Sequence, residues 1–262
     1  MDLGLSGRVS LVAAGSKGLG FAVAQELAKE GAAVAICARG RDALDAAVAS
    51  LRALGARAHG VVADVSRADD IARLVSETES TFGPIDIVVT NSGGPKSGRF
   101  ETLTPADWDS AASVLLTSAV TLTRAVLPGM RARQWGRILN ITSIAAKQPV
   151  EGLMLSNSLR AAVIAFARTL ANEVATDGIT VNNLLPGYTR TERVVDLSNQ
   201  VAARESVTVE SVYAKWEQEI PMRRIGEPRE FAALAAFLAS ERASYITGQS
   251  IAVDGGWIKG ML

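Results

Sequence analysis

The chain alternates short apolar segments, rich in β-branched residues, with longer segments in which apolar residues recur every three or four positions. The short segments predict buried parallel strands, because strands covered on both faces are apolar throughout. The longer segments, such as the one containing Phe21, Ala24, Leu27 and Ala28, have the spacing of amphipathic helices. The seven predicted strands lie at residues 9–13, 33–38, 61–63, 85–90, 137–141, 180–185 and 250–253.

This alternation predicts a single α/β domain over residues 1–262. We expect a Rossmann-like, doubly wound parallel sheet of about seven strands with helices on both faces, and a ligand at the carboxyl ends of the strands. The polar segment 192–221 interrupts the pattern. A long connection in a compact domain is usually functional, so we expect a substrate lid there, with an ordinary surface excursion as the alternative.

Composition and charge narrow the class of protein. The 27 Lys and Arg residues balance 27 Asp and Glu residues, so no overall basic field attracts nucleic acid or an anionic membrane. No uncharged apolar run reaches the length of about 18 residues that a membrane span needs. The single cysteine, Cys37, cannot form an internal disulfide, and the first residues lack the pattern of a secretory signal. We therefore expect a cytoplasmic protein that binds small molecules or copies of itself.

A glycine-rich turn follows the first strand and precedes a predicted helix over residues 21–30. Free backbone N–H groups and the positive end of the helix dipole attract phosphate, and glycines allow a pyrophosphate to approach closely. A turn that binds no nucleotide is the alternative. The residues expected to form the anion site are Gly15, Ser16, Lys17, Gly18, Leu19 and Gly20.

The end of the second predicted strand indicates which dinucleotide binds. An acidic residue there would hold the adenosine ribose 2′-hydroxyl of NAD, but this position is Ala38. Arg39 beside it and Lys17 in the turn offer two cations to a 2′-phosphate. The sequence therefore favours NADP(H) over NAD(H), unless both cations are merely solvated.

The glycine turn resembles the Thr-Gly-x-x-x-Gly-x-Gly turn of the short-chain dehydrogenase/reductase family. Gly18 and Gly20 match the last two glycines, whereas Ala13 and Ala14 replace the first two residues and a glycine follows at Gly15. The turn is therefore rebuilt, and a positive φ at Ala14 would weaken cofactor binding.

The resemblance covers nearly the whole chain. Segments 136–140, 178–182 and 186–187 are similar to those of bacterial 3-oxoacyl-carrier-protein reductases. The resemblance implies that residues after the third strand contact the adenine of the cofactor. It also implies that residues after the fourth strand approach the cofactor, and that residues after the sixth strand contact the nicotinamide carboxamide. The residues at these places are Asp64, Val65, Asn91, Gly93, Pro186, Gly187, Thr189 and Thr191.

The same resemblance implies an altered catalytic centre. Family members reduce ketones or oxidise alcohols with an asparagine, a serine, a tyrosine that exchanges the proton, and a lysine that lowers the tyrosine pKa and binds the nicotinamide ribose. Ser143 matches the serine, but Ser156, Arg160 and Leu115 stand at the tyrosine, lysine and asparagine positions. Arg160 can still place positive charge on the ribose hydroxyls, but an arginine cannot join a proton relay. The usual mechanism should be severely impaired.

Four residues are candidate substitutes for the missing groups. Lys147 and Tyr188 lie close in sequence to the predicted site, and Lys96 and Tyr213 lie in the loop after the fourth strand and in the polar segment. Each is also an ordinary residue for a loop or lid.

Two function classes remain open. The chain is an NADP(H)-dependent reductase of a small-molecule or acyl-thioester substrate with an atypical proton donor, or an NADP(H)-binding or regulatory protein without turnover. His59 has no second ligand nearby in sequence, so no metal site is expected. Apolar positions in segments 104–130 and 155–176 predict helix pairing in a homotetramer or homodimer, and Trp108, Trp135 and Trp257 are expected to serve packing or an interface.

Overall fold

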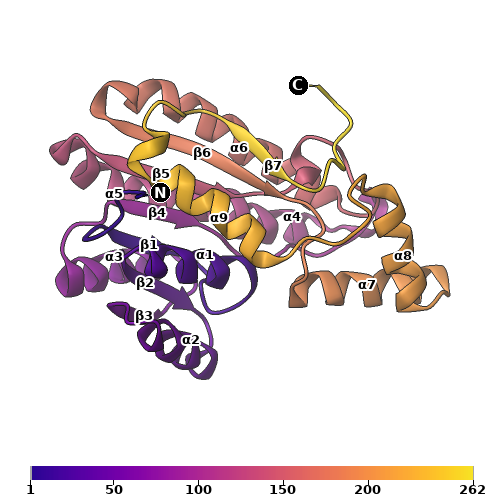
Figure 1. Cartoon of the computed structure of the whole chain (residues 1–262). Helices are drawn as coiled ribbons and strands as arrows, with labels where there is room; N and C mark the ends of the chain where they lie inside the picture. Colours follow the sequence, from indigo (N-terminus) through magenta and orange to yellow (C-terminus); the bar gives the residue numbers. More distant parts are fainter. Residues whose placement is uncertain (1, 262) are drawn as a thin grey trace.

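The computed structural model describes residues 2–261 and contains one parallel sheet. Its seven strands are β1 (Val9–Val12), β2 (Ala33–Ala38), β3 (Ala58–Val62), β4 (Ile87–Thr90), β5 (Gly136–Ile141), β6 (Ile179–Pro186) and β7 (Ser250–Val253). Their order is β3-β2-β1-β4-β5-β6-β7 (Figure 1). The order reverses between β1 and β4, which is where doubly wound sheets bind ligands. The predicted fold class is confirmed.

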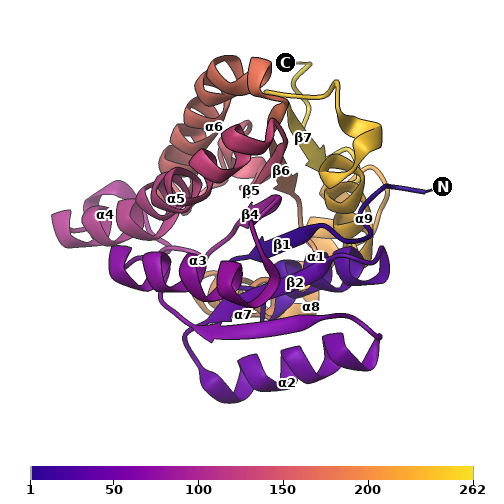
Figure 2. The ribbon, with the colours of Figure 1, turned by 90° about the vertical axis from the view of Figure 1, so that its left-hand side faces the viewer.

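Helices cover both faces of the sheet (Figure 2). The nine α-helices of the described residues are α1 (Gly18–Lys29), α2 (Arg41–Ala53), α3 (Ala68–Phe82), α4 (Pro105–Ala112), α5 (Ser118–Arg133), α6 (Met154–Val174), α7 (Glu192–Glu205), α8 (Val209–Glu219) and α9 (Pro228–Ala239). One core packs α1, α2 and α9 against the sheet, and the other packs α3, α5 and α6 against the opposite face.

The two largest differences from the predicted boundaries lie at the starts of β3 and α1. β3 begins at Ala58 rather than at residue 61, because it is an edge strand whose polar members, His59 among them, are half-buried and hide the apolar pattern. α1 begins at Gly18 rather than at residue 21, so the last two glycines of the turn belong to the first helical turn.

The polar segment predicted over residues 192–221 folds as α7 and α8. These two helices share a small core of their own, in which Val194, Val212, Trp216 and Ile220 pack with Trp257 near the carboxyl terminus. Figure 1 places them beyond the end of β6, apart from the two helical layers. A role for this segment as a substrate lid remains a prediction.

The longest helical stretch runs from Pro105 to Arg133 and includes a π-helical turn over Ser113–Thr117 between α4 and α5. By length and composition it is the one helix of the described residues that could cross a membrane. Its apolar side packs on the sheet through residues such as Leu122 and Met130. The same stretch was predicted to pair with another copy of the chain.

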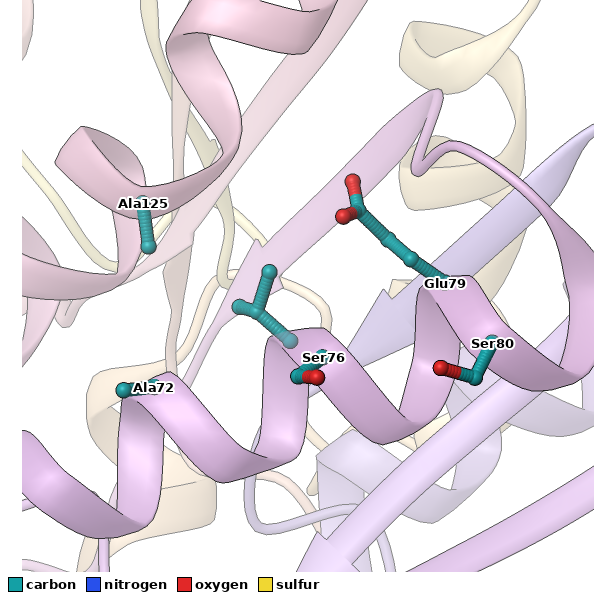
Figure 3. Close-up of a pocket in the computed structure, with 6 residues that line it drawn as sticks. Ala72, Ser76, Glu79, Ser80 and Ala125 are labelled. Atoms are coloured by element: carbon teal, nitrogen blue, oxygen red, sulfur yellow. The ribbon is translucent and has the colours of Figure 1, made fainter.

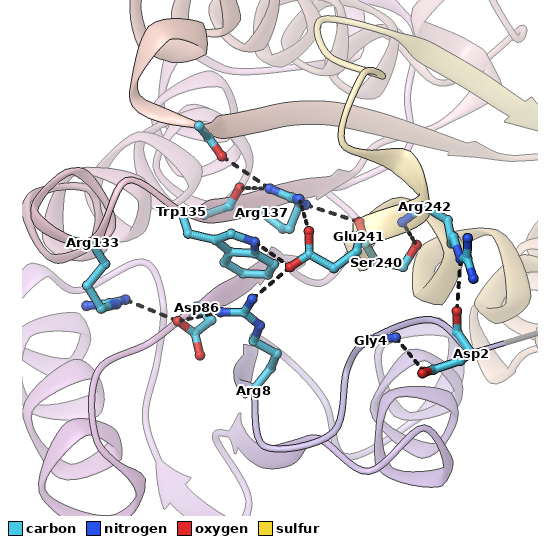
Figure 4. Close-up of polar contacts among 12 residues, drawn as sticks. Asp2, Gly4, Arg8, Asp86, Arg133, Trp135, Arg137, Ser240, Glu241 and Arg242 are labelled. Atoms are coloured by element: carbon cyan, nitrogen blue, oxygen red, sulfur yellow. Dashed lines mark hydrogen bonds and ion pairs between the residues drawn. The ribbon is translucent and has the colours of Figure 1, made fainter.

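Charged groups cluster at the amino end of the sheet (Figure 4). Arg137, at the start of β5, is 2% exposed and lies over the Trp135 ring, with Cζ 4.2 Å from its centroid. Its guanidinium donates to the carbonyls of Ser240 and Gly178 and lies 3.7 Å from Glu241. Trp135 Nε1 also donates to Glu241, at 2.8 Å. Every part of this buried cation therefore has a partner.

A chain, or ladder, of hydrogen-bonded polar side chains crosses the sheet from β4 to β7. Thr90 donates to Asn140 at 2.7 Å, Asn140 donates to Asn183 at 3.1 Å, and Asn183 donates to Ser250 at 3.0 Å. These residues are cross-strand neighbours on β4, β5, β6 and β7. The ladder fixes the relative register of the strands whose ends carry the candidate site, because any slip would bury unpaired amides.

Candidate active site

The glycine-rich turn has the shape that its altered sequence predicts. Ala14 adopts a φ of 45°, in the left-handed region that glycine prefers. Gly15 lies so close to β2 that a Cβ would stand 2.7 Å from Ile36 Cγ2, and a Cβ on Gly20 would stand 2.5 Å from the Ala14 carbonyl oxygen. The turn is therefore rebuilt around a strained alanine, with glycines kept where the backbone is crowded.

The start of α1 has the properties of a phosphate site. Lys17 at the N-cap position makes no side-chain capping bond, so the first N–H groups of the helix have no side-chain acceptor there. Asn91 Nδ2 donates to the Ala14 carbonyl at 3.3 Å and ties the loop after β4 to the turn. A Cβ on Gly93 would meet nothing within 4 Å, so that loop leaves open space. These residues fit a dinucleotide diphosphate.

An exposed cation stands at the end of β2, where the adenosine part of the dinucleotide is predicted to bind. Arg39 is exposed at this end. The Asp64 carboxylate accepts from the Ser66 N–H and Oγ at 2.9 and 2.7 Å, and these bonds lower its pKa, with nearby Arg39 a further cause. Cys37 is buried, and burial raises its thiol pKa to about 11, which makes it unreactive near neutral pH.

Lys17 has a partner that the sequence did not reveal. Its Nζ lies 3.1 Å from a carboxylate oxygen of Glu192, the first residue of α7. A Cβ on Gly18 would contact Thr191 at 3.7 Å, so the entry to α7 lies directly over the glycine turn. The segment from Pro186 to Thr191, predicted to reach the carboxamide, is thus joined to the phosphate turn at its far end.

The residues at the tyrosine and lysine positions touch each other. Arg160 Nε donates to Ser156 Oγ at 3.2 Å, one helical turn away on α6. The same guanidinium donates through one terminal nitrogen to the carbonyls of Ile141 and Thr142, at 3.1 and 2.9 Å. Ser143 follows these carbonyls directly, so the structure brings the three predicted residues together at the end of β5.

These contacts orient two hydroxyl groups. Ser143 Oγ accepts from the Ala145 N–H at 3.1 Å, and Ser156 Oγ accepts from Arg160. Each oxygen thereby has a fixed donor, and each O–H hydrogen remains available for a further acceptor. The pair can therefore act as hydrogen-bond donors toward a carbonyl oxygen.

Arg160 is a cation without a counter-ion. Burial and, to a smaller extent, nearby Arg193 on α7 lower its pKa to about 10. Within residues 2–261 no carboxylate forms an ion pair with it; its three bonds go to neutral oxygens. With this pKa the guanidinium stays charged at neutral pH and adds positive potential to the site.

Leu115, at the asparagine position, is buried in the π-helical turn and offers no hydrogen bond. Tyr188 stacks on Trp216 with ring centroids 4.4 Å apart, and burial raises its pKa to about 12, which makes it a weaker acid than a free phenol. Lys96 pairs with Asp107 at 2.9 Å.

The other two candidate substitutes are no better placed. Tyr213 packs edge-on against Trp216, with ring centroids 5.6 Å apart. Lys147 is exposed on its loop. Among residues 2–261, neither side chain forms a hydrogen bond with Ser143, Ser156 or Arg160.

Two hollows lie in the described structure. A groove of about 500 Å³ between α3 and α5 contains none of the predicted site residues; it is lined by Ala72, Val75, Ser76, Glu79, Ser80 and Ala125 (Figure 3). A second pocket, of about 390 Å³, lies between the 149–153 loop, Tyr188 and the helices α7 and α8. The second pocket borders the loop that joins Ser143 to Ser156.

Comparison with known proteins agrees with this geometry. Residues 13–258 match the family model described as Enoyl-(Acyl carrier protein) reductase. The dehydrogenase/reductase SDR family member 4 of Oryctolagus cuniculus is 36% identical over 253 residues, which cover 96% of this chain and 94% of that protein. The chain belongs to the short-chain dehydrogenase/reductase family.

Two further relatives of this short-chain dehydrogenase/reductase are named for their reactions. The 3-oxoacyl-[acyl-carrier-protein] reductase of Aquifex aeolicus is 33% identical over 257 residues, covering 98% of this chain and 99% of that protein. The L-sorbose reductase of Gluconobacter frateurii, solved with NADPH and L-sorbose, has a TM-score of 0.94 and 34% identity over the whole of both chains. The relatives thus include reductases of chemically different substrates.

Proposed function

We propose that this chain is an NADP(H)-dependent carbonyl reductase that stabilises the developing alkoxide with Ser143, Ser156 and Arg160. The observation that carries the proposal is the Arg160–Ser156 bond, because the Ser156 oxygen accepts there and its hydrogen stays free to be donated to a ligand. Bound NADPH would supply the hydride. The two hydroxyls would donate to the carbonyl oxygen, and Arg160 would hold Ser156 in place and add positive charge.

Proton donation is the step in which the proposed mechanism differs from the tyrosine mechanism that the family resemblance implies. A serine hydroxyl is a far weaker acid than a tyrosine, and Arg160 stays charged below its pKa of about 10. We infer that the alkoxide takes its proton from water. The raised pKa of Tyr188 supports this inference, because it makes that phenol a poor replacement.

The proposed preference for NADP(H) rests on Arg39 and on Ala38 at the end of β2, and is supported by the NADPH in the solved L-sorbose reductase. The residues proposed to hold the dinucleotide are Gly15, Ser16, Lys17, Gly18, Leu19, Gly20, Arg39, Asp64, Val65, Asn91, Gly93, Arg160, Pro186, Gly187, Thr189 and Thr191. A homo-oligomer in the cytoplasm remains the expected state of the protein.

The second candidate is an NADP(H)-binding protein without turnover. The observation that favours it is Leu115, which cannot replace the hydrogen bonds of an asparagine. The deciding measurement is single-turnover oxidation of NADPH with a panel of 3-oxoacyl thioesters and small ketones. For the reductase we expect measurable oxidation that slows about 10²-fold in Arg160→Met and less in Ser156→Ala.

Arg168→Met is the matched control, since Arg168 lies on the same helix, is exposed, and donates a side-chain hydrogen bond to the Gly248 carbonyl. Its rate should equal that of the unaltered protein. NADPH binding without oxidation of NADPH by any compound of the panel would favour the second candidate. Equal rates in all the variants would contradict the assigned roles.

A further inference from the structure

The pocket of about 390 Å³ has an aromatic back wall built from distant parts of the chain. Tyr188 follows β6, Trp216 lies on α8, and Trp257 lies near the carboxyl terminus. Tyr188 stacks on Trp216, and its ring meets that of Trp257 edge-on with centroids 6.2 Å apart. Tyr188 directly follows the Pro186–Gly187 turn, so one end of this wall lies next in the chain to residues proposed to hold the dinucleotide.

Charges of both signs surround the pocket. Glu205 on α7 pairs with Arg204 at 2.9 Å and with Lys215 at 3.7 Å. Glu151 pairs with Arg99, and Glu219 accepts from Trp257 Nε1 at 3.4 Å. With Arg99 counted, the three lining carboxylates are balanced by three cations, and each of these cations is already paired. The rim therefore offers no excess positive charge to an anionic tail such as the phosphates of a thioester carrier.

Neutral hydrogen-bonding groups remain free beside these pairs. Gln200 lines the pocket from α7 with an exposed side chain. Ser97 lines it from the loop after β4, and its Oγ is buried without a hydrogen-bond partner. A buried hydroxyl without a partner is unfavourable, and rotation about its Cα–Cβ bond offers it to a ligand. The chain thus presents both donors and acceptors to a neutral ligand.

We propose that the substrate is a neutral, polyhydroxylated carbonyl compound about the size of a hexose, and not an acyl thioester. This inference rests on the proposed reductase function. An apolar wall with a few placed polar groups is the usual form of a small-molecule site, and 390 Å³ is at the low end of the roughly 300–1,000 Å³ range of such sites. Gln200 and Ser97 would bind substrate hydroxyls, while the carbonyl end lies toward Ser143 and Ser156.

The test measures binding separately from turnover. NADPH is first titrated into the full chain, and a failure to bind contradicts the proposed function itself. The NADP⁺-loaded protein is then titrated with D-fructose and with acetoacetyl-CoA, followed by saturation-transfer NMR of the small molecule. We expect saturable D-fructose binding that is tighter than that of acetoacetyl-CoA.

Variants locate the binding. Gln200→Leu and Ser97→Ala should each weaken D-fructose binding about three- to tenfold, the usual effect of one hydrogen bond. The matched controls are Asn199→Leu, at the exposed position beside Gln200, and Ser80→Ala in the α3–α5 groove; both should bind as the unaltered chain does. Tighter binding of acetoacetyl-CoA, or D-fructose binding that neither pocket variant weakens, would overturn the inference while leaving the reductase proposal intact.

Discussion

Two arginines lie at opposite ends of β5, Arg137 buried and Arg160 half-buried, and they differ in their partners. Arg137 at the amino end stacks on Trp135, bonds three carbonyls and lies 3.7 Å from the Glu241 carboxylate. Arg160 at the carboxyl end bonds two carbonyls and one hydroxyl, and the nearest influence on its charge is another cation, Arg193. Burial lowers the pKa of both.

The difference separates a structural cation from a functional one. Burying a charge is costly unless an opposite charge offsets it, and Glu241 does this for Arg137. Arg160 lacks such a partner, so its positive potential is directed at whatever enters the site. An uncompensated, partly buried charge is a property of active sites more often than of scaffolds. The comparison therefore supports the proposed roles, stability for Arg137 and chemistry for Arg160.

The largest expected effect comes from restoring the missing proton donor at the carboxyl end. Ser156→Tyr combined with Arg160→Lys should raise the single-turnover rate by about 10²- to 10⁴-fold, the usual contribution of general acid catalysis. The measurement is NADPH oxidation under single-turnover conditions with the best substrate of the panel. Arg160→Lys alone, which supplies no phenol, serves as the control. Intact NADPH binding with no gain in rate would mean that more than the proton donor is lost.

Exchanging each arginine for methionine tests the comparison directly. Arg137→Met leaves three buried carbonyls and Glu241 without their donor, so the free energy of unfolding should fall by about 2–4 kcal/mol. Arg160→Met also leaves the Ile141 and Thr142 carbonyls without this donor, but it removes a charge that has no counter-ion, so the free energy of unfolding should fall by less than in Arg137→Met, although activity falls. Urea unfolding monitored by circular dichroism measures both. A larger loss of stability in Arg160→Met than in Arg137→Met would reverse the assignment.

Most of the fold could be predicted from the sequence, but little of the difference between Arg137 and Arg160 could be. All seven strands were predicted from apolar runs, because central parallel strands are buried on both faces. The helices α7 and α8 were not predicted, since their apolar residues face a small separate core built with Trp257. The resemblance to the short-chain dehydrogenase/reductase family indicated Ser143, Ser156 and Arg160 as candidate site positions.

The bonding of these residues could not be predicted, because it depends on where the end of β5 stands relative to α6. The ion pair of Lys17 with Glu192 joins residues 175 positions apart, and no local pattern indicates such a contact. The buried ladder that includes Asn140 and Asn183 was likewise not anticipated. Its members are ordinary polar residues within predicted strands, and only the strand register makes them neighbours.

Arg39 extends the comparison to a cation that is exposed. If it binds the 2′-phosphate, Arg39→Ala should weaken NADPH binding about tenfold or more, as expected for a charge-assisted hydrogen bond, and leave NADH binding unchanged. Calorimetric titration with each nucleotide measures this, with Arg41→Ala on the first turn of α2 as the control. Equal losses for NADPH and NADH would show that the adenosine phosphate is held elsewhere.

The smallest expected effect concerns Lys17, a cation whose exposed partner competes with the ligand. Glu192→Gln removes the ion pair between the glycine turn and α7, and exposed pairs contribute little to stability, so unfolding should be almost unchanged. Lys17 is then free for the phosphates of the nucleotide, and NADPH should bind a few-fold more tightly at low salt, with the gain shrinking as salt is raised. Weaker binding of NADPH would instead mean that Glu192 helps to hold α7 over the bound nucleotide. The Glu192 carboxylate would then assist nucleotide binding rather than compete with the nucleotide for Lys17.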